Sequence, residues 1–421
     1  MEGYSDSLDL FTRPAADMGL LKRQWVDTHP INSITEDSPI EFNIPANTLR
    51  YIDLSRTFLN VKIKVLKQDG TEMEEVTQLA PVNLTLHSLW RQVDFSLGQV
   101  PLPGVGVNYS YKAIIDTLLE KNATSKESQL QGQFYHKDTA GKMDATKFGS
   151  NYGFNWRHEK VSKSITAELE GPLFVDLAQQ DKCLINSVPI NIKLWPSNNR
   201  FRLMVDPTET PPEYKIHIEE ASLKLCKITV NPKIILAHDA ALKYSPALYY
   251  YMRSDIKTYS IAEGSFNVQI DNIFNGQVPS SVVVGLVAGD AYNGNYVKNP
   301  YNFQNFNVNW ACFYVDDNPT PQKGFSPVYL SGFQGNYTTS YLTIFGNSRG
   351  ENFGNDIYLD DFAQGYALYK FNISNADQIK KKGSTRLELS FKTALTEVVT
   401  VIVYAKFPHL LRVNESRRVL L

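Results

Sequence analysis

Histidines are the residues best suited to bind a transition metal or to act as a general base, but here they are scattered. No two of them are near neighbours, whereas ligands on adjacent strands must converge from closely spaced positions. They stand at His29, His87, His136, His158, His217, His238 and His409. This spacing predicts no metal centre and no cofactor.

Motifs for acid–base, nucleophilic and phosphate chemistry are weak as well. Carboxylate pairs such as Asp360-Asp361 are adjacent, and adjacent side chains of a strand point to opposite faces. The chain contains no Gly-x-Ser-x-Gly. Gly104-x-Gly106 lacks the Lys-Ser/Thr that follows in a phosphate-binding loop. We therefore predict that the protein is not an enzyme.

Composition and charge describe a folded protein without a general affinity for nucleic acid. The chain has 421 residues, 43% of them hydrophobic and 20% charged, and a net charge of −2. This length allows two domains with cores of their own. Nucleic-acid affinity rests mainly on Lys and Arg contacts to phosphates, and the short basic run 380–382 is followed by Gly383, as in a solvated turn. We expect no direct sequence-specific contact with nucleic acid.

Cysteine usage and hydropathy bear on the compartment. Cys183, Cys226 and Cys312 are far apart and odd in number, which is typical of reduced, buried thiols in an intracellular protein. The first residues lack the basic and apolar pattern of a secretory signal. No apolar stretch approaches the roughly 20 residues that span a bilayer. We expect no signal peptide and no membrane span.

A period of two dominates from residue 40 onward. Apolar residues alternate with polar ones from Leu59 to Val65, and the pattern stops at Asp69-Gly70. This predicts a half-buried strand that ends in a turn. In residues 214–230 the apolar phase shifts by one position more than once, which predicts β-bulges.

Helical patterns are few and short. Residues 110–121 place their apolar side chains on one face, with Ser110 as the expected N-cap. A second helix is expected to start with Asn231 as its cap and Pro232 at its first position, where proline is favoured. A third is expected near Asp360.

The second of these helices divides the chain into two halves of similar material, with short strands, turns, long polar loops and one or two small helices. We predict an all-β protein of two tandem eight-stranded jelly-roll sandwiches, with a few short helices and an N-terminal arm. The predicted boundaries are an arm at 1–39, a first jelly roll at 40–230, a helical connector at 231–245, and a second jelly roll with the C-terminal tail at 246–421.

A loop in the second half alternates asparagines with aromatic residues. Its main members are Tyr292, Asn293, Tyr296, Tyr301, Phe303 and Phe306. Such a composition suits a carbohydrate site, a protein interface or a loop packed against its own sandwich. Composition alone leaves these three interpretations open.

The predicted arm carries apolar residues but is too short to form a core. Leu10, Phe11 and Trp25 lie among its three prolines. We expect such a segment to dock on another surface.

Six idiosyncratic stretches run in order from about Leu8 to about Asn414. They are SLDLFTRPAA, PIEFNIPANTLRYIDLSRTFLNVKIKV, PVNLTLHSLWRQVDFSLG, GPLFVDLAQQDKCLINSVPINIKL, NIFNGQVPSSVVVGLVAGDAYNGNYVKNPYNFQNFNVNWACFYVD and TVIVYAKF. Together they resemble the hexon-type major capsid proteins of Polinton/Maverick elements and adintoviruses.

The resemblance implies a double jelly roll that forms a pseudo-hexagonal homotrimer, the tile of an icosahedral capsid around double-stranded DNA. Such a protein assembles inside the host cell and resides in the virion. Its partners would be copies of itself, a penton protein and minor capsid proteins. By this resemblance, the loop of Tyr292, Asn293, Tyr296, Tyr301, Phe303 and Phe306 would contact another subunit. Leu10, Phe11 and Trp25 of the arm would meet neighbouring trimers or minor capsid proteins beneath the capsomer.

Two alternatives remain from the sequence. One is a two-domain β-sandwich protein that binds carbohydrate, which a secretory signal or disulfides would favour. The other is a domesticated host protein derived from a capsid protein, which would keep the fold and its interfaces.

Overall fold

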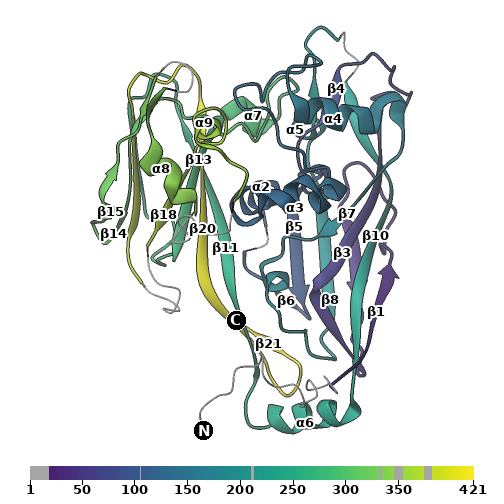
Figure 1. The fold of residues 1–421 in the computed structure, drawn as a ribbon. Helices are drawn as coiled ribbons and strands as arrows, with labels where there is room; N and C mark the ends of the chain where they lie inside the picture. The colour runs from purple at the N-terminus through teal and green to yellow at the C-terminus, as the bar shows by residue number, and fades with distance from the viewer. Residues whose placement is uncertain (1–18, 105, 210–212, 331–333, 346–353, 374–381) are drawn as a thin grey trace, which may run out of the picture.

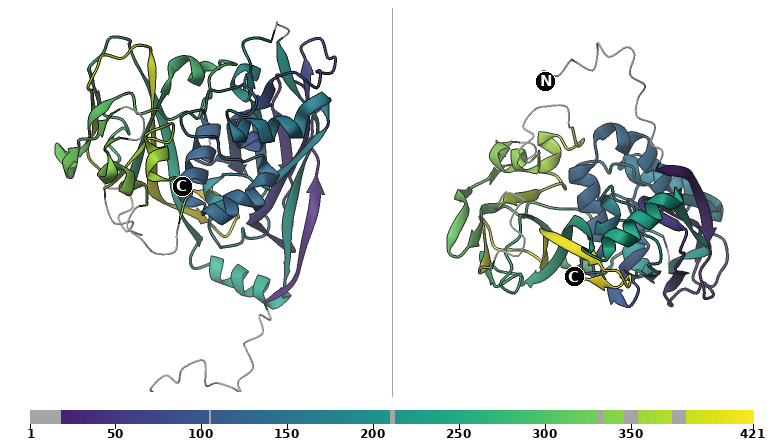
Figure 2. Two further views of the ribbon diagram at one scale, coloured as in Figure 1. Left: turned by 45° about the horizontal axis from the view of Figure 1, so that its top comes forward. Right: turned by 90° about the horizontal axis from the view of Figure 1, so that it is seen from below.

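The chain forms two β-sandwiches that stand side by side and are joined at one end by helix α6 (Pro232–Leu242) (Figure 1). The computed structural model describes residues 19–104, 106–209, 213–330, 334–345, 354–373 and 382–421. Seen from below, α6 and the C-terminal strands lie together beneath the two sandwiches (Figure 2).

The first sandwich consists of two four-stranded antiparallel sheets. In order, one sheet contains β1 (Leu20–Thr28), β10 (Tyr214–Val230), β3 (Arg50–Lys67) and β7 (Ala167–Pro172). The other contains β2 (Ile40–Ile44), β8 (Ile190–Pro196), β5 (Trp90–Leu97) and β6 (Val100–Pro101).

The second sandwich repeats this plan. One sheet contains, in order, β11 (Ala247–Ile261), β20 (Val399–Val413), β13 (Ser281–Ala288) and β18 (Leu368–Asn372), with β21 (Val419–Leu420) also paired to β20. The other contains β12 (Asn267–Asp271), β19 (Thr385–Phe391), β14 (Val308–Val315) and β15 (Asn318–Phe325).

Both halves have the same topology. When the eight main strands of each half are counted along the chain, the two sheets read first, eighth, third, sixth and second, seventh, fourth, fifth in both cases. This is the strand order of a jelly roll, so the predicted fold class is confirmed. Two short pairs lie outside these sheets: β4 (Leu79–Pro81) with β9 (Leu203–Val205), and β16 (Val328–Tyr329) with β17 (Gly335–Asn336).

Short helices fill the loops, and several of them lie between the sandwiches or above them (Figure 1). In the first half they are α1 (Thr85–Ser88), α2 (Tyr109–Glu120), α3 (Ala123–Glu127), α4 (Tyr152–Val161) and α5 (Asn199–Arg202). In the second half they are α7 (Gly289–Asn293), α8 (Thr338–Leu342) and α9 (Leu359–Phe362). Single 3₁₀ turns add η2 (Gln129–Gln133), η3 (Ser162–Ser164), η4 (Asp176–Gln179) and η5 (Thr343–Phe345).

The helix starts follow the sequence in part. Asn231 caps α6, because its side chain accepts a hydrogen bond from the Lys233 amide and Pro232 occupies the first helical position, as predicted. The predicted cap of α2 is wrong. That helix begins at Tyr109, and the residue before it, Asn108, adopts a left-handed conformation without a side-chain cap.

The strand patterns hold closely. The alternating apolar residues Leu59, Val61, Ile63 and Val65 of β3 are all fully buried. The pairing of β10 with β3 shifts register at two places along β10, which confirms the predicted bulges.

Part of the predicted N-terminal arm belongs to the first sandwich. Residues 20–28, which the sequence assigned to the arm of residues 1–39, form β1 and pair with β10 along its edge. The pairing satisfies backbone groups that β10 would otherwise expose at a sheet edge. Leu10 and Phe11 lie outside the described residues.

Candidate functional site

The asparagine- and aromatic-rich loop packs inside the chain, where the first jelly roll meets the second; we call this contact the seam. Tyr301 and Phe303 are 2% and 0% exposed. Both rings lie edge-on to Tyr111 of α2, with centroids 5.7 and 6.5 Å away. The Tyr111 hydroxyl also donates a hydrogen bond to the Pro300 carbonyl (3.0 Å). The loop of the second half therefore closes on a helix of the first.

Two further loop tyrosines cross the seam. Tyr292 stacks on Tyr111 at 5.6 Å and donates its hydroxyl proton to Asn108 Oδ1 (2.9 Å). Tyr296 donates to the Tyr214 carbonyl (3.0 Å). Both side chains are half-buried, so most of the loop serves contacts within the chain.

Burial corrects the predicted role of this loop. Tyr301 and Phe303 leave almost no exposed surface for a second chain, so this structure does not support them as subunit contacts. The alternative in which the loop packs against its own chain describes them better. Phe306 is half-buried against the core, whereas Asn293 is exposed. A subunit contact at Asn293 stays a prediction.

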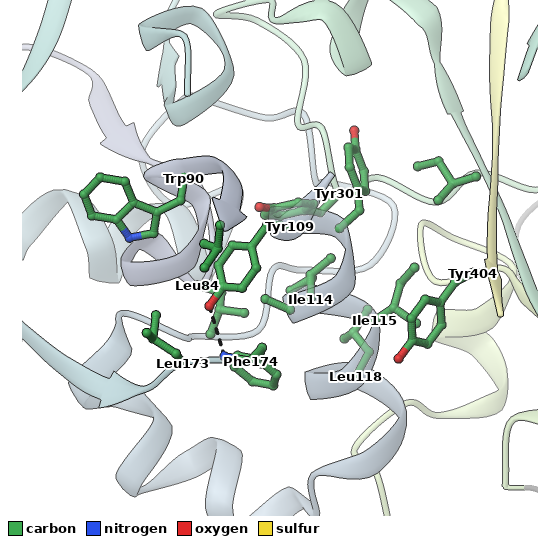
Figure 3. Close-up of a cluster of buried hydrophobic side chains, with 14 of the residues drawn as sticks. Leu84, Trp90, Tyr109, Ile114, Ile115, Leu118, Leu173, Phe174, Tyr301 and Tyr404 are labelled. Atoms are coloured by element: carbon green, nitrogen blue, oxygen red, sulfur yellow. Dashed lines mark hydrogen bonds between the residues drawn. The ribbon is translucent and has the colours of Figure 1, made fainter. Parts of the chain in front are cut away.

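Helix α2 is the centre of the seam. Its residues from Tyr109 to Leu119 are all buried. The side chains of Ile115 and Leu118 lie on the side of α2 that faces Tyr404 of β20 (Figure 3). On the opposite side, the Tyr109 hydroxyl accepts a hydrogen bond from the Phe174 amide (3.0 Å), drawn as a dashed line in Figure 3. The helix therefore packs on both jelly rolls.

A buried ionic cluster joins α2 to the second roll. Lys112 Nζ lies 3.0 Å from Asp116 Oδ2 and 2.9 Å from Asp176 Oδ1. Asp176 also accepts hydrogen bonds from the Ser254 amide (2.8 Å) and hydroxyl (2.9 Å). Because Ser254 belongs to β11, this carboxylate connects the two halves directly.

Strand β20 contributes the remaining members of this cluster. The Tyr404 hydroxyl donates to Asp116 Oδ1 (2.6 Å), and Lys406 Nζ lies 3.5 Å from the same oxygen. Lys406 also pairs with Glu120 at the end of α2. Asp116 therefore has charged or hydroxyl partners from both rolls.

Opposite charges within the cluster offset the effect of burial on the pKa values of its members. Burial alone would raise the pKa of Asp116, but Lys112 and Lys406 hold that pKa well below its ordinary value. Burial would lower the pKa of Lys112, but Asp116 and Asp176 keep it above its ordinary value. Asp116 and Lys112 are therefore both ionised near neutral pH. Loss of one partner would leave a buried charge without compensation.

A buried histidine supports the start of α2. His87 of α1 is 0% exposed, with Nδ1 3.0 Å from the Tyr109 hydroxyl and Nε2 2.8 Å from Gln133 Oε1. Burial lowers the pKa of His87 to about 4. The neutral ring accepts a hydrogen bond from Tyr109 at one nitrogen and donates to Gln133 from the other. His87 is thus a structural residue.

A second buried charge pair lies further along the seam. Arg157 of α4 and Asp138 are both fully buried as side chains, and Arg157 Nη2 lies 2.7 Å from Asp138 Oδ1. Asn299 of the loop donates from Nδ2 to Asp138 Oδ2 (3.0 Å), and the Tyr366 hydroxyl donates to the Asp138 carbonyl (2.7 Å). This asparagine therefore satisfies a carboxylate of the other half.

At the end of the molecule that carries α6, apolar side chains are exposed and not buried. Only Leu242 of α6 is buried, and α6 is held by an ion pair between Asp239 and Arg417 (2.5 Å). Beside it, Leu248 and Leu420 both lie in register with Arg412 of β20 and so share one side of the sheet. We define the base surface by its exposed apolar residues, which are Leu236 (69%), Tyr244 (91%), Leu248 (48%), Tyr250 (43%) and Leu420 (49%).

Trp25, the described residue of the three predicted arm contacts, sits on β1. Its side chain is 48% exposed, and Nε1 donates to the Arg56 carbonyl (3.1 Å). The ring therefore retains surface for a partner, although the residue belongs to a sheet and not to an arm.

Metal-binding clusters and membrane-spanning helices are both absent from the described ranges. No group of three or more His, Cys, Asp or Glu side chains there is arranged to hold a metal ion. Within the same ranges, no helix is both long and apolar enough to cross a bilayer.

Known proteins share this architecture. No protein-family model matches the chain. An uncharacterized protein of Caenorhabditis elegans is 21% identical over 424 residues, covering 96% of this chain and 98% of that protein. Among solved structures, a chain of the Sputnik virophage matches all of this chain and 92% of its own length, with a TM-score of 0.63 and 12% identity.

Two further structures agree. The mavirus major capsid protein matches with a TM-score of 0.54 and 10% identity over 100% of this chain and 95% of its own. A chain of the PBCV-1 virus capsid matches with a TM-score of 0.55 and 12% identity over 96% and 97%. The chain is a double jelly roll. At such identities the likeness is one of fold.

The charged residues that fix this double jelly roll were missed by sequence reasoning. Lys112 and Asp116 are opposite charges four positions apart in an otherwise apolar helix. On an exposed helix that spacing is an ordinary stabilising pair. One signal in the sequence could have marked this pair as buried. Apolar residues occur on most sides of α2, so the helix offers these two charges no clearly polar face toward water.

Proposed function

We propose that this double jelly roll is a structural major capsid protein, of the type found in Polinton/Maverick elements and adintoviruses. The observation that carries the proposal is the pair of jelly rolls with one strand order, joined by the buried seam. Structures with the same fold include the mavirus major capsid protein and a chain of the PBCV-1 capsid. At such low sequence identity, the structural likeness supports the fold alone. The capsid function is our inference from that fold.

The symmetry of the proposed capsomer follows from the duplicated roll. Three chains supply six rolls of one topology, so a threefold trimer has six similar wedges around its axis. Such a pseudo-hexagonal block can tile an icosahedral shell around double-stranded DNA. Closed cyclic symmetry is also the common solution for a homo-oligomer. For this role the rolls of one chain must keep a fixed mutual orientation, which is the task we assign to the seam.

The base surface is the proposed contact between copies of the chain. Exposed apolar patches on folded proteins commonly mark interaction sites. The Gly19 carbonyl accepts a hydrogen bond from the Asn231 amide (2.9 Å) at the start of α6, so Gly19, the first described residue, lies beside α6. We propose that Leu10, Phe11 and Trp25 meet neighbouring trimers or minor capsid proteins.

The remaining parts of the proposal concern location and partners. The protein would act without catalysis or a cofactor, assemble inside the host cell and reside in the virion. Its partners would be its own copies, a penton protein and minor capsid proteins. The exposed Asn293 would be a further subunit contact.

A second candidate function is that of a capsid-derived host protein. The C. elegans relative favours it, because an animal protein of matching length keeps 21% identity along nearly all of this chain. A host protein of this kind would keep the fold. It would differ from a capsid protein in whether its trimers build closed shells.

The mass of the purified chain in solution tests the proposal. One chain weighs 47.6 kDa, so light scattering after size exclusion should give a trimer of about 143 kDa. Negative-stain images of the same peak should show three- or six-cornered blocks, and shells at higher concentration. Blocks without shells would favour the host protein. A monomer at every concentration would overturn both.

A further inference from the structure

A groove of about 510 Å³ opens along the seam beside α9. Residues 141–145 of the first roll form one wall, and residues 302, 304–307, 363–365 and 396–397 of the second roll form the rest. Its volume lies within the roughly 300–1,000 Å³ of ligand pockets. We propose that this groove binds a neutral oligosaccharide. The inference is independent of the capsid proposal, because it rests on the groove and not on assembly.

The carboxylates of the groove are already engaged. Asp144 accepts hydrogen bonds from the Asn299 amide (2.7 Å) and from Asn302 Nδ2 (2.8 Å). Glu397 pairs with Lys298 at 2.6 Å. Among the lining residues, the exposed Lys142 is the one cation. An anionic ligand would therefore face two carboxylates and one exposed lysine, and a cationic ligand would compete with Lys298 and the amide donors for the same carboxylates.

Three amide side chains of the lining are free. Within the described part of the chain, the side chains of Gln304, Asn307 and Gln364 take part in no hydrogen bond, although Gln304 and Gln364 are half-buried. Each amide offers donors and an acceptor. A sugar hydroxyl both donates and accepts, so free amides around a groove match a chain of hydroxyls. They match an apolar ligand poorly, because its binding would leave the amides unsatisfied.

An aromatic residue in an unusual conformation borders these amides. Phe306 and Asn307 have φ values of 42° and 54°, and bulky residues rarely occupy this left-handed region. Three hydrogen bonds hold the turn: from the Val308 amide to the Asn305 carbonyl (2.9 Å), from the Asn307 amide to Asn305 Oδ1 (2.8 Å), and from Asn305 Nδ2 to the Ala363 carbonyl (2.7 Å). Backbone strain of this kind, here at Phe306, is found at ligand sites. The half-buried Phe306 ring supplies the flat apolar surface on which the C–H face of a sugar packs.

The walls of the groove meet closely at one glycine. Gly365 has a φ of 107°, and a Cβ on it would lie 2.2 Å from Met143 Sδ and 2.9 Å from Asn302 Oδ1. The first roll can therefore approach the second here only because this side chain is absent. The groove is thus a product of the double jelly roll and would not exist in either roll alone.

Saturation-transfer NMR on the full chain, in its native oligomeric state, tests the inference. The probes are neutral oligomers of glucose, mannose, N-acetylglucosamine and N-acetyllactosamine, with sialylated and sulfated oligosaccharides for comparison. We expect at least one neutral probe to bind. Binding should weaken at least tenfold in the double variant Gln304→Ala/Gln364→Ala and in Phe306→Gly, which keeps the left-handed turn accessible.

Asn309→Ala is the matched control, because Asn309 is an exposed amide on β14 that does not line the groove. Its binding should equal that of the unaltered chain. The inference is overturned if no neutral probe binds at millimolar concentration, if only anionic probes bind, or if the groove variants bind like the control. If the chain forms a trimer but binds no sugar, this inference is overturned and the capsid proposal stands. If the chain binds sugar but stays a monomer, the capsid proposal is overturned and this inference stands.

Discussion

The seam and the base surface are both rich in apolar side chains, but those of the seam are buried and those of the base surface are exposed. At the seam, Phe303 and Tyr301 are buried, and the carboxylates Asp116 and Asp176 of the α2 cluster have partners from the second roll. At the base, Leu236 of α6 and Tyr244 just after its end remain largely exposed, and Leu242 is the one buried residue of α6.

This difference separates two kinds of interface. Buried ion pairs add little net stability over apolar packing but penalise every arrangement in which a partner is missing. The seam therefore selects one mutual orientation of the two rolls. The base surface has no such charge pattern among its members, so its exposed apolar area favours association with a further chain.

Removal of the central carboxylate should break the seam most severely. Asp116→Ala leaves the buried Lys112 and the half-buried Lys406 without this partner, and loss of one member of a buried pair costs about 3–5 kcal/mol. Chemical unfolding followed by fluorescence should show this loss. Glu75→Ala is the control, since the Glu75 side chain is 70% exposed in its pair with Lys163 and its removal should cost at most about 1 kcal/mol. Equal effects of the two changes would mean that the cluster is not a structural centre.

Truncation of the buried loop ring tests the corrected role of the loop. Phe303→Ala should cost about 3–5 kcal/mol of folding free energy, as expected for a fully buried aromatic side chain. The same unfolding measurement applies. Asn293→Ala in the exposed part of the loop should change stability by less than about 0.5 kcal/mol. If Phe303→Ala kept full stability and lost only trimer formation, the original interpretation as a subunit contact would return.

His87 should make the seam sensitive to mild acid. Its folded pKa of about 4 lies below its ordinary 6.5, so the unfolded chain takes up the proton first as pH falls. The stability linked to His87 is complete above about pH 6.5 and declines toward pH 4. Between pH 7.5 and pH 5 the loss should be about 2 kcal/mol.

Unfolding midpoints at a series of pH values check this expectation. The slope between pH 7.5 and pH 5 should flatten in His87→Gln and persist in His217→Gln, a change at an exposed strand position. The depressed pKa of Asp116 acts only below its ordinary value of 3.8, outside this range. An identical slope in all three proteins would refute the assignment to His87.

The base surface should affect association and leave folding almost unchanged. Leu236→Ser with Tyr244→Ser removes exposed apolar area, so unfolding should shift by less than about 0.5 kcal/mol. Self-association should weaken about tenfold, or roughly 1.4 kcal/mol. Sedimentation over a dilution series measures it, with Val76→Ser as an exposed apolar control outside this surface. Unaltered association would assign the subunit contact elsewhere.

The sequence predicted the architecture well because its main signals are local. Alternation along β3 and the phase shifts along β10 predicted strands and bulges that the structure contains. Asn231 and Pro232 identified the start of α6 for the same reason. The resemblance to capsid proteins then implied a double jelly roll, which the structural comparisons bear out.

Long-range contacts account for what the sequence did not predict. Residues 20–28 become a strand only because β10, about 200 positions away, offers an open edge. The burial of Phe303 depends on α2 in the other half. The mixed composition of α4 hides its helical period, because its charged Arg157 is buried against Asp138. Pairing partners of this kind cannot be predicted from one local pattern.

Cryo-electron microscopy of the purified chain tests the central claim most directly, because it displays the orientation of the rolls and their assembly together. We expect a threefold particle of six jelly rolls, with the two rolls of each chain joined through α2 as in Figure 1, and with the base surface covered by a neighbouring copy. A monomer, or an oligomer in which the two rolls separate at the seam, would contradict the account.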